Sequence, residues 1–451
     1  MKVIAGLNST SHKKSTKFRI ITSVICVFVV VSMGLAGLAY WGELRIQSLE
    51  NSRHASVFSN QRLADDLAKF DSLGIHRSGT PGDVATTQWL EQEFKELGYQ
   101  VRRESFPVSS WQIDEALLTL GNKTVNVFPQ YPVKPTAGQG ITAELRLWNA
   151  ENKQDYSGKI VVLDTDFWDH RADLASGDFY QRILAVSNSG AAAIVIITRA
   201  GCGRYQAFNA PLALPDWKVP VVLAGENDAA TLLQGLAQKH SVSLRVSAKP
   251  QTLDAFNLVA EIGPSSEPAI VVSTPQSGWF TTTSERGSGV AAFLALARWA
   301  ATQNKHYIFY SNSGHERGNA GAHVTMKSAP KPDQVALWLH IGANAGALGV
   351  PPSEGVVKTR FVMTNWWQLP KTWALFRRHT GGLAWPLPLE LGVTAGELTE
   401  YHNAGYAAIG SFGASPWHHC PNDRLEQTSV AATRELALSY AALLAELFLA
   451  N

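Results

Sequence analysis

The sequence predicts an α/β protein with a mostly parallel central sheet, helices on both faces, a β-rich insert and an N-terminal transmembrane helix. Three observations predict this class. After residue 255 short apolar segments alternate with helical ones, which is typical of a parallel sheet covered on both sides. Between residues 113 and 250 glycine and proline loops separate short β-branched runs, and residues 20–41 carry no charge. The length of 451 residues fits two or three domains.

The uncharged segment 20–41 is long enough to cross a membrane, because a helix of this length spans about 33 Å. Basic residues precede it, namely Lys13, Lys14, Lys17 and Arg19, whereas the charges after it balance. This asymmetry predicts a single-pass anchor with residues 1–19 in the cytoplasm and the rest periplasmic or extracellular. A signal peptide cleaved near Ala39 is the alternative, and the length of the apolar run favours an uncleaved signal-anchor.

The helices and strands after the anchor are predicted from the periodicity of apolar residues and from the glycine and proline residues that separate them. Helices are expected over 62–73 and 84–98, with a loop at 78–83 between them and a strand from residue 99. In the insert we expect strands at 159–164, 192–198 and 219–224. Strands of the main sheet follow at 257–262, 269–274, 306–314, 335–342, 359–364 and 406–413, and helices at 289–303 and 430–449. The first of these two helices is apolar nearly all round, so we expect it to be buried.

Composition excludes some classes of function. A net charge of +2 with 17% charged residues gives no electrostatic reason to bind nucleic acid. The three cysteines are Cys26, inside the apolar segment, Cys202 and Cys420. They allow at most one disulfide in the soluble part and no C-x-x-C zinc site. We therefore expect a fold that does not depend on disulfides.

Four strand ends or loops carry residues that bind metals or protons. They contribute Glu285; His315 and Glu316; His340; and His418, His419 and Asp423. Sites in parallel sheets form beyond the carboxyl ends of the strands, so these residues are expected to meet there. Carboxylates with imidazoles are the usual ligands of catalytic zinc. His418 is expected at the rim of the site, because consecutive side chains usually diverge.

On these motifs the chain resembles the zinc aminopeptidase family, which includes bacterial leucyl aminopeptidases, glutamate carboxypeptidase, glutaminyl cyclases and the transferrin receptor. The motifs are Glu285-Arg286-Gly287-Ser288-Gly289, the His315-Glu316 pair, His340 at a strand end, and His419-Cys420-Pro421-Asn422-Asp423. The resemblance assigns residues 42–112 and 251–451 to a zinc peptidase-like domain. It assigns residues 113–250, with GKIVVLD, SGAAAIVII and VPVVLAGENDAATLL, to a protease-associated domain insert.

The resemblance also implies a ligand set. Glu285, Glu316 and His419 stand where family members hold one zinc ion. His340 stands at a ligand position of the second ion and can still coordinate, as a fourth ligand of the ion that remains. Another ligand of that second ion is replaced by Pro275, so the resemblance implies one zinc ion and the loss of the other. Glu285 can reach the metal or pair with Arg286 or Arg317 instead.

His315 replaces the residue that acts as the family's general base, and a histidine can carry a proton near neutral pH. It can also serve as a fourth ligand. Two functions follow. One is a membrane-anchored, single-zinc aminopeptidase-like hydrolase acting on peptides or amino-acid derivatives outside the cytoplasm. The other is a catalytically inactive relative that serves as a binding or assembly scaffold.

Overall fold

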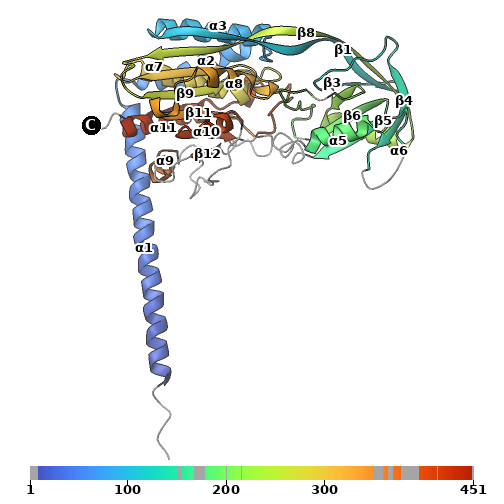
Figure 1. Ribbon diagram of the computed structural model, residues 1–451. Helices are drawn as coiled ribbons and strands as arrows, with labels where there is room; N and C mark the ends of the chain where they lie inside the picture. The colour runs from blue at the N-terminus through green and yellow to red at the C-terminus, as the bar shows by residue number, and fades with distance from the viewer. Residues whose placement is uncertain are drawn as a thin grey trace, which may run out of the picture.

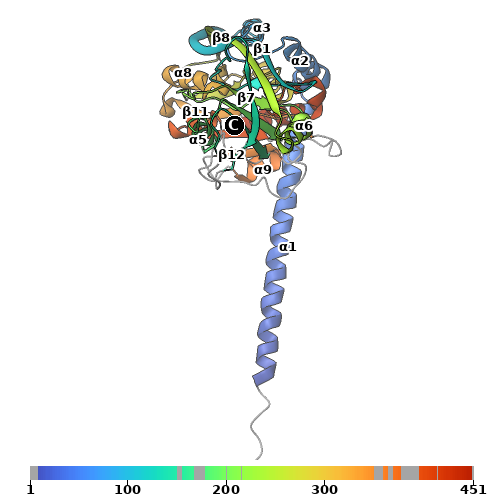
Figure 2. The ribbon, with the colours of Figure 1, turned by 90° about the vertical axis from the view of Figure 1, so that its right-hand side faces the viewer.

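The structure is a computed structural model that describes residues 9–149, 155–166, 178–199, 201–214, 216–349, 359–363, 369–376, 396–413 and 415–448. It consists of one long helix and a folded body (Figures 1 and 2). The first eight residues of the predicted cytoplasmic tail lie outside the described residues.

The N-terminal helix α1 (Ser9–Glu50) projects from the body for most of its length (Figures 1 and 2). The part from Val27 to Glu50 is long and apolar enough to cross a membrane. Phe28 is 72% exposed, whereas Ile46 near the end of the helix is 1% exposed and belongs to the main core. The helix therefore continues past the predicted end of the anchor and enters the folded body without a linker.

The main sheet has four parallel strands at its centre, in the order β13-β11-β9-β10. Their bounds are β9 Ala269–Pro275, β10 Tyr307–Asn312, β11 Val335–Ile341 and β13 Ala408–Gly413. Antiparallel strands flank them, with β12 (Thr359–Met363) beside β13 and β8 (Ser241–Ile262) beside β10. The predicted mostly parallel sheet is confirmed.

Helices cover both faces of this sheet (Figure 1). One face packs against α2 (Asn60–Ser72), α3 (Pro81–Glu96), α7 (Ser288–Ala300) and α11 (Val430–Phe448), and the other against α8 (Ala320–Ser328) and α10 (Leu398–Asn403). Alternation along β9 explains the two cores, since Ile270 and Val272 point to the first face and Ala269 and Val271 to the second. Every residue of α7 is buried, as its all-round apolar sequence predicts.

A second region with its own hydrophobic core lies at the other end of the molecule (Figure 1). Its strands run in the order β4-β5-β6-β7-β3, where β4 is Ile141–Leu147, β5 Ile160–Asp166, β6 Ala193–Arg199, β7 Val221–Ala224 and β3 Phe128–Pro129. The helices are α5 (Asp178–Ser187) and α6 (Glu226–Ala237). Its identity as a protease-associated domain stays a prediction.

A two-stranded ribbon joins the two regions. Strands β1 (Gln100–Leu120) and β8 pair antiparallel over nearly their whole length, and β2 (Lys123–Asn126) pairs with the end of β1. The predicted boundaries at residues 112 and 250 both fall inside this ribbon. The chain thus passes between the regions on hydrogen-bonded strands, and the ribbon fixes where the second region stands against the main sheet.

Candidate active site

The turn that presents Glu285 connects β9 with α7, and the side chain of Asp423 holds it in place. Thr282 has a φ of 52°, and a π-helical turn follows over Thr283–Gly287. The Asp423 carboxylate accepts hydrogen bonds from the backbone N–H of Ser284 at 2.7 Å and of Glu285 at 3.0 Å. Glu285 itself is fully buried. Asp423 is therefore part of the scaffold that positions this carboxylate.

His418 and His419 both face Glu285. His418 Nδ1 lies 3.6 Å and His419 Nε2 lies 3.4 Å from Glu285 Oε1. The two rings stack with centroids 3.8 Å apart and an interplanar angle of 25°. The expectation that His418 would lie at the rim is wrong, because the φ of 58° at His419 turns the backbone so that consecutive side chains converge.

The arrangement of these three donors fits a zinc ion. Two ligand atoms about 2.0–2.1 Å from a tetrahedral zinc ion lie roughly 3.4 Å apart, close to both distances above. His419 Nδ1 lies 2.9 Å from the Ala207 carbonyl oxygen, which accepts its proton and leaves the Nε2 lone pair directed at Glu285. His419 Nε2 and Glu285 Oε1 are both buried without a hydrogen bond. Among the described residues, Glu285, His418 and His419 are the group that could hold a metal ion.

The two imidazoles differ in their hydrogen bonds and in their exposure. The Asn344 side-chain nitrogen lies 3.3 Å from His418 Nδ1 and also donates to the Gly413 carbonyl oxygen at 3.0 Å. His418 also keeps a quarter of its side chain exposed, whereas His419 is nearly fully buried. His419 is therefore the more firmly placed of the two imidazoles.

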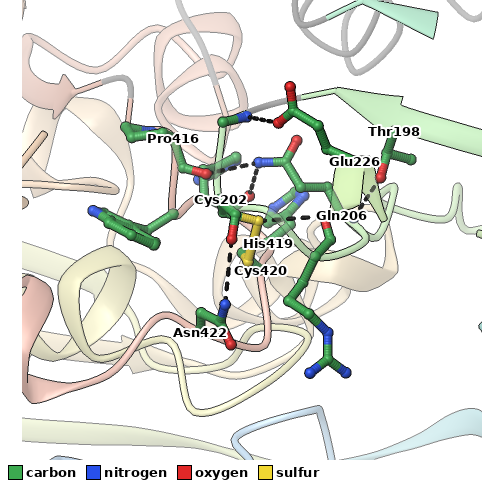
Figure 3. The surroundings of a disulfide bond; sticks show 12 residues. Thr198, Cys202, Gln206, Glu226, Pro416, His419, Cys420 and Asn422 are labelled. Atoms are coloured by element: carbon green, nitrogen blue, oxygen red, sulfur yellow. Dashed lines mark hydrogen bonds between the residues drawn. A yellow bond between two sulfur atoms is a disulfide. The ribbon is translucent and has the colours of Figure 1, made fainter. Parts of the chain in front are cut away.

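The β-rich region holds the histidine turn in place (Figure 3). A disulfide joins Cys202 to Cys420, the residue after His419, across 218 positions of sequence. Gln206 Nε2 donates to the carbonyl oxygens of Pro416 at 3.0 Å and His418 at 2.9 Å. The sequence allowed this one disulfide but gave no reason to expect its position. It lies beside the candidate ligands, so the insert is part of the site.

A second cluster contains His315, His340 and Glu397. His315 Nδ1 lies 3.5 Å from Glu397 Oε1. Glu397 Oε2 accepts hydrogen bonds from Asn312 Nδ2 at 2.9 Å and from the Tyr401 hydroxyl at 3.1 Å. Sequence reasoning missed Glu397, because it precedes α10 in a stretch without a motif.

Burial sets the protonation states in this cluster. It lowers the pKa of His315 well below its usual value, and it lowers that of His340 to about 4. Burial also raises the pKa of the Glu397 carboxyl. Both imidazoles are neutral near pH 7, so each can accept a proton or offer a lone pair.

The structure places Glu316 and His340, two of the predicted ligands, outside the three-residue group. Glu316 Oε1 accepts the Ser78 backbone N–H at 2.7 Å and the Ser78 hydroxyl, and its Oε2 accepts the Ser277 hydroxyl at 2.8 Å. His340 Nδ1 lies 2.9 Å from the Ser273 hydroxyl. The Glu316 carboxylate thus ties together three loops, and His340 lies with Glu397 in the second cluster.

Arg286 places a buried positive charge beside both clusters. Its Nη2 lies 2.8 Å from Glu285 Oε1, its Nε donates to the Ser277 carbonyl oxygen at 3.0 Å, and the residue is 1% exposed. Burial opposes ionisation of Glu285, but His418 and Arg286 outweigh it and hold the pKa of that carboxyl well below its usual value. Of the alternatives the sequence left open for Glu285, pairing with Arg286 is realised.

No family model matches the chain. In sequence it is similar to a probable lipoprotein aminopeptidase of Mycobacterium tuberculosis, with 25% identity over 311 residues. That alignment covers 62% of this chain and 58% of the relative, so the chain spans somewhat more than half the length of this relative.

Solved structures with the same fold are aminopeptidases and a peptidase. A peptidase precursor from Shewanella amazonensis has a TM-score of 0.71 at 15% identity, covering 90% of this chain and 96% of that one. A zinc aminopeptidase from Bacillus subtilis has a TM-score of 0.66 at 16% identity, covering 86% and 95%. An aminopeptidase from an Aneurinibacillus strain has a TM-score of 0.61 at 18% identity, covering 87% and 94%. The predicted resemblance to the zinc aminopeptidases and their fold is confirmed.

Proposed function

From the zinc aminopeptidase fold that this chain shares, we propose that it is a membrane-anchored hydrolase that removes N-terminal residues from peptides with a single zinc ion. The observation that carries the proposal is the set of three donor atoms on Glu285, His418 and His419, whose spacing suits one tetrahedral ion. A zinc ion there would supply a Lewis acid for the scissile carbonyl and lower the pKa of water.

His315 is the proton carrier in this proposal. Its neutral imidazole accepts a proton from the attacking water and returns it to the leaving amine. Glu397 Oε1, 3.5 Å from His315 Nδ1, orients the ring and stabilises the imidazolium once it forms. Glu397 acts through His315 and is a positioning residue. Glu316 holds the Ser78 and Ser277 loops around the site.

The proposed location is the outer face of a membrane. The side chains of α1 around Phe28 are exposed and apolar, which suits a lipid environment, and the basic residues before them favour a cytoplasmic N-terminus. The Cys202–Cys420 disulfide adds an independent argument, because such bonds persist in oxidising compartments. Substrates are then peptides or amino-acid derivatives outside the cytoplasm.

A catalytically inactive scaffold is the second candidate, and one observation favours it. The Glu285–Arg286 ion pair gives the central carboxylate a protein cation where a metal ion would otherwise supply the charge. In that case the fold serves as a binding module and takes up no zinc.

Metal analysis of the full-length protein in detergent separates the two candidates. We expect about one zinc ion per chain and release of amino acids from a panel of aminoacyl p-nitroanilides. Glu285→Ala should lose both zinc and turnover. His240→Ala, which changes an exposed histidine of the second region, is the matched control and should keep both. A well-folded wild-type protein that takes up no zinc when it is supplied would favour the scaffold.

A further inference from the structure

Arg286 has hydrogen-bonding capacity that the protein does not use. A guanidinium carries five N–H donors. The Nε donates to the Ser277 carbonyl oxygen, whereas Nη1 and Nη2 are buried without a hydrogen-bond partner, although Nη2 lies within ion-pair distance of Glu285. A buried charged group with free donors is costly unless an acceptor completes it. The free N–H groups therefore indicate an acceptor that is not part of the protein.

Arg298 shows what a purely structural buried arginine looks like in this chain. It is 5% exposed, and its Nη1 and Nη2 both donate to Asp66, at 2.5 and 2.9 Å. Its Nη2 also donates to Glu93 at 2.7 Å. Two carboxylates thus bond both Nη atoms of Arg298, although its Nε is buried without a partner, whereas both Nη atoms of Arg286 lack a hydrogen bond and only Nη2 lies near a carboxylate.

The backbone around Arg286 is built to hold it at the centre of the site. The Arg286 N–H donates to the Thr282 carbonyl oxygen at 2.7 Å, inside the π-helical turn that Asp423 supports. The acceptor of its Nε, Ser277, also contacts Glu316 through its hydroxyl. The guanidinium is therefore fixed between the loop after β9 and the Glu285 turn and cannot swing away to solvent.

The position of the guanidinium decides which acceptor suits it. Nη2 is 2.8 Å from Glu285 Oε1, the oxygen that faces His418 and His419. A substrate carbonyl placed beside Glu285, His418 and His419 has its oxygen within reach of Arg286. Burial and, after it, the positive charge of Arg286 lower the pKa of His315, the proposed proton carrier. The free N–H groups thus lie beside Glu285 Oε1, the oxygen atom that both imidazoles face.

We propose that Arg286 is the oxyanion-binding residue of this site, donating its free Nη–H groups to the scissile carbonyl oxygen as that oxygen becomes negatively charged. The inference rests on the proposed hydrolase function. When the water oxygen bonds to the carbonyl carbon, the C=O π pair moves to the oxygen held by Arg286 and the water proton moves to His315. Re-formation of C=O then breaks the C–N bond, and His315 returns the proton to the amine.

The test compares Arg286→Gln with Arg298→Gln, which removes an equally buried arginine outside the site. We expect Arg286→Gln to keep its zinc, to lose about 10²–10³-fold in kcat with KM nearly unchanged, and to bind the phosphonate analogue of the best substrate more weakly by a similar factor. Arg298→Gln should stay within about threefold of wild type in all three measurements. Arg286→Lys keeps the charge but not the forked donors, so it should recover only part of the loss.

Equal kcat and equal phosphonate affinity in Arg286→Gln and Arg298→Gln would overturn the inference. If Arg286→Gln does not fold, Arg286→Lys replaces it, and wild-type kcat in that variant would have the same consequence. If wild type hydrolyses no substrate, the hydrolase proposal has failed by itself. Calorimetric titration of zinc-supplied protein with inorganic phosphate then decides whether Arg286 binds anions, since binding that is equal in wild type and Arg286→Gln would exclude it.

Discussion

The two clusters at the carboxyl edge of the sheet differ in what their polar atoms already bind. In the first, Glu285 Oε1 and His419 Nε2 face each other without a hydrogen bond. In the second, Glu397 Oε2 is bonded by Asn312 and Tyr401, and His340 Nδ1 is close to the Ser273 hydroxyl. The second cluster also keeps two atoms without a hydrogen bond, Glu397 Oε1 and His315 Nδ1. The clusters therefore differ in geometry, because among the described residues the first cluster is the one that brings three ligand atoms within reach of one metal ion.

The difference supports the proposal of a single metal position in a site whose residues differ from those of the family. Where family members hold a second ion, this chain has Pro275 at the strand end, and the Arg286 guanidinium lies nearby, where its Nε donates to the Ser277 carbonyl oxygen. Arg286 lies next to Glu285 and supplies a fixed positive charge there, and it needs no protein ligands to do so. The comparison thus predicts that the first cluster binds one zinc ion. It predicts that the second cluster transfers protons and binds no metal.

Removal of one histidine from each cluster gives the largest contrast. His419→Ala should lower zinc affinity by more than 100-fold, because it deletes a ligand whose orientation the Ala207 carbonyl fixes. His340→Ala should leave zinc affinity within a few-fold of wild type. Zinc titration against a competing chelator measures both. Comparable losses in the two variants would mean that the metal bridges the clusters, as the ligand set implied by the resemblance requires.

His315 provides the next contrast, between metal binding and turnover. His315→Ala should lower kcat by about 10²–10⁴-fold and keep the zinc content, since it removes the proton carrier and no ligand. Glu397→Gln, which acts through the His315 ring, should lose less and should change the pH profile of kcat. Zinc content and steady-state rates are measured on the same preparations. Loss of zinc in His315→Ala would make it a ligand, the alternative that the sequence left open.

The sheet could be predicted from the sequence, whereas the pairing of residues inside the site could not. Strands and helices follow from local apolar periodicity, and β9, β10 and β11 begin and end within two residues of the predicted bounds. The convergence of four strand ends follows from parallel topology. Which side chains then touch depends on φ at His419 and on distant residues such as Ala207, and neither leaves a local pattern.

Glu397 and Arg286 show two different limits of sequence reasoning. Glu397 carries no motif, and only the packing of α10 against the main sheet brings it to His315. Arg286 was visible within a recognised motif, but its burial could not be known, and an exposed arginine next to a glutamate is the ordinary expectation. The proposed role of Arg286 depends on the burial of its side chain, which is a property of the whole fold.

The disulfide offers a further way to compare the two clusters, because it supports the turn of the first cluster and not the second. Replacing both Cys202 and Cys420 with serine should lower the free energy of unfolding by about 2–5 kcal/mol, because the bond closes a long loop. It should also weaken zinc binding by about tenfold, since the turn that carries His418 and His419 loses a covalent support. Denaturant unfolding and zinc titration measure the two effects. Unchanged zinc affinity would show that Gln206 and Ala207 hold the turn by themselves.

His76 gives the smallest effect and a reference for both clusters, because it is a buried histidine with a structural role. Its ring stacks on Phe70, Nδ1 lies 2.9 Å from the Thr281 carbonyl oxygen, and Nε2 is buried without a partner. Burial lowers its pKa from 6.5 to about 3. The unfolded chain therefore binds a proton below pH 6.5 that the folded chain refuses, so stability is complete above pH 6.5 and falls as pH drops towards 3.

This loss amounts to at most about 1.4 kcal/mol per pH unit from one group. His76→Gln removes the titrating ring, so the slope of unfolding free energy between pH 6.5 and 4 should become shallower by up to that amount, although the variant is less stable at pH 7. Urea unfolding at several pH values, with wild type and His240→Ala as references, measures the slope. Identical slopes in His76→Gln and wild type would mean that the acid sensitivity comes from other histidines whose pKa burial lowers, namely His315, His340 and His418.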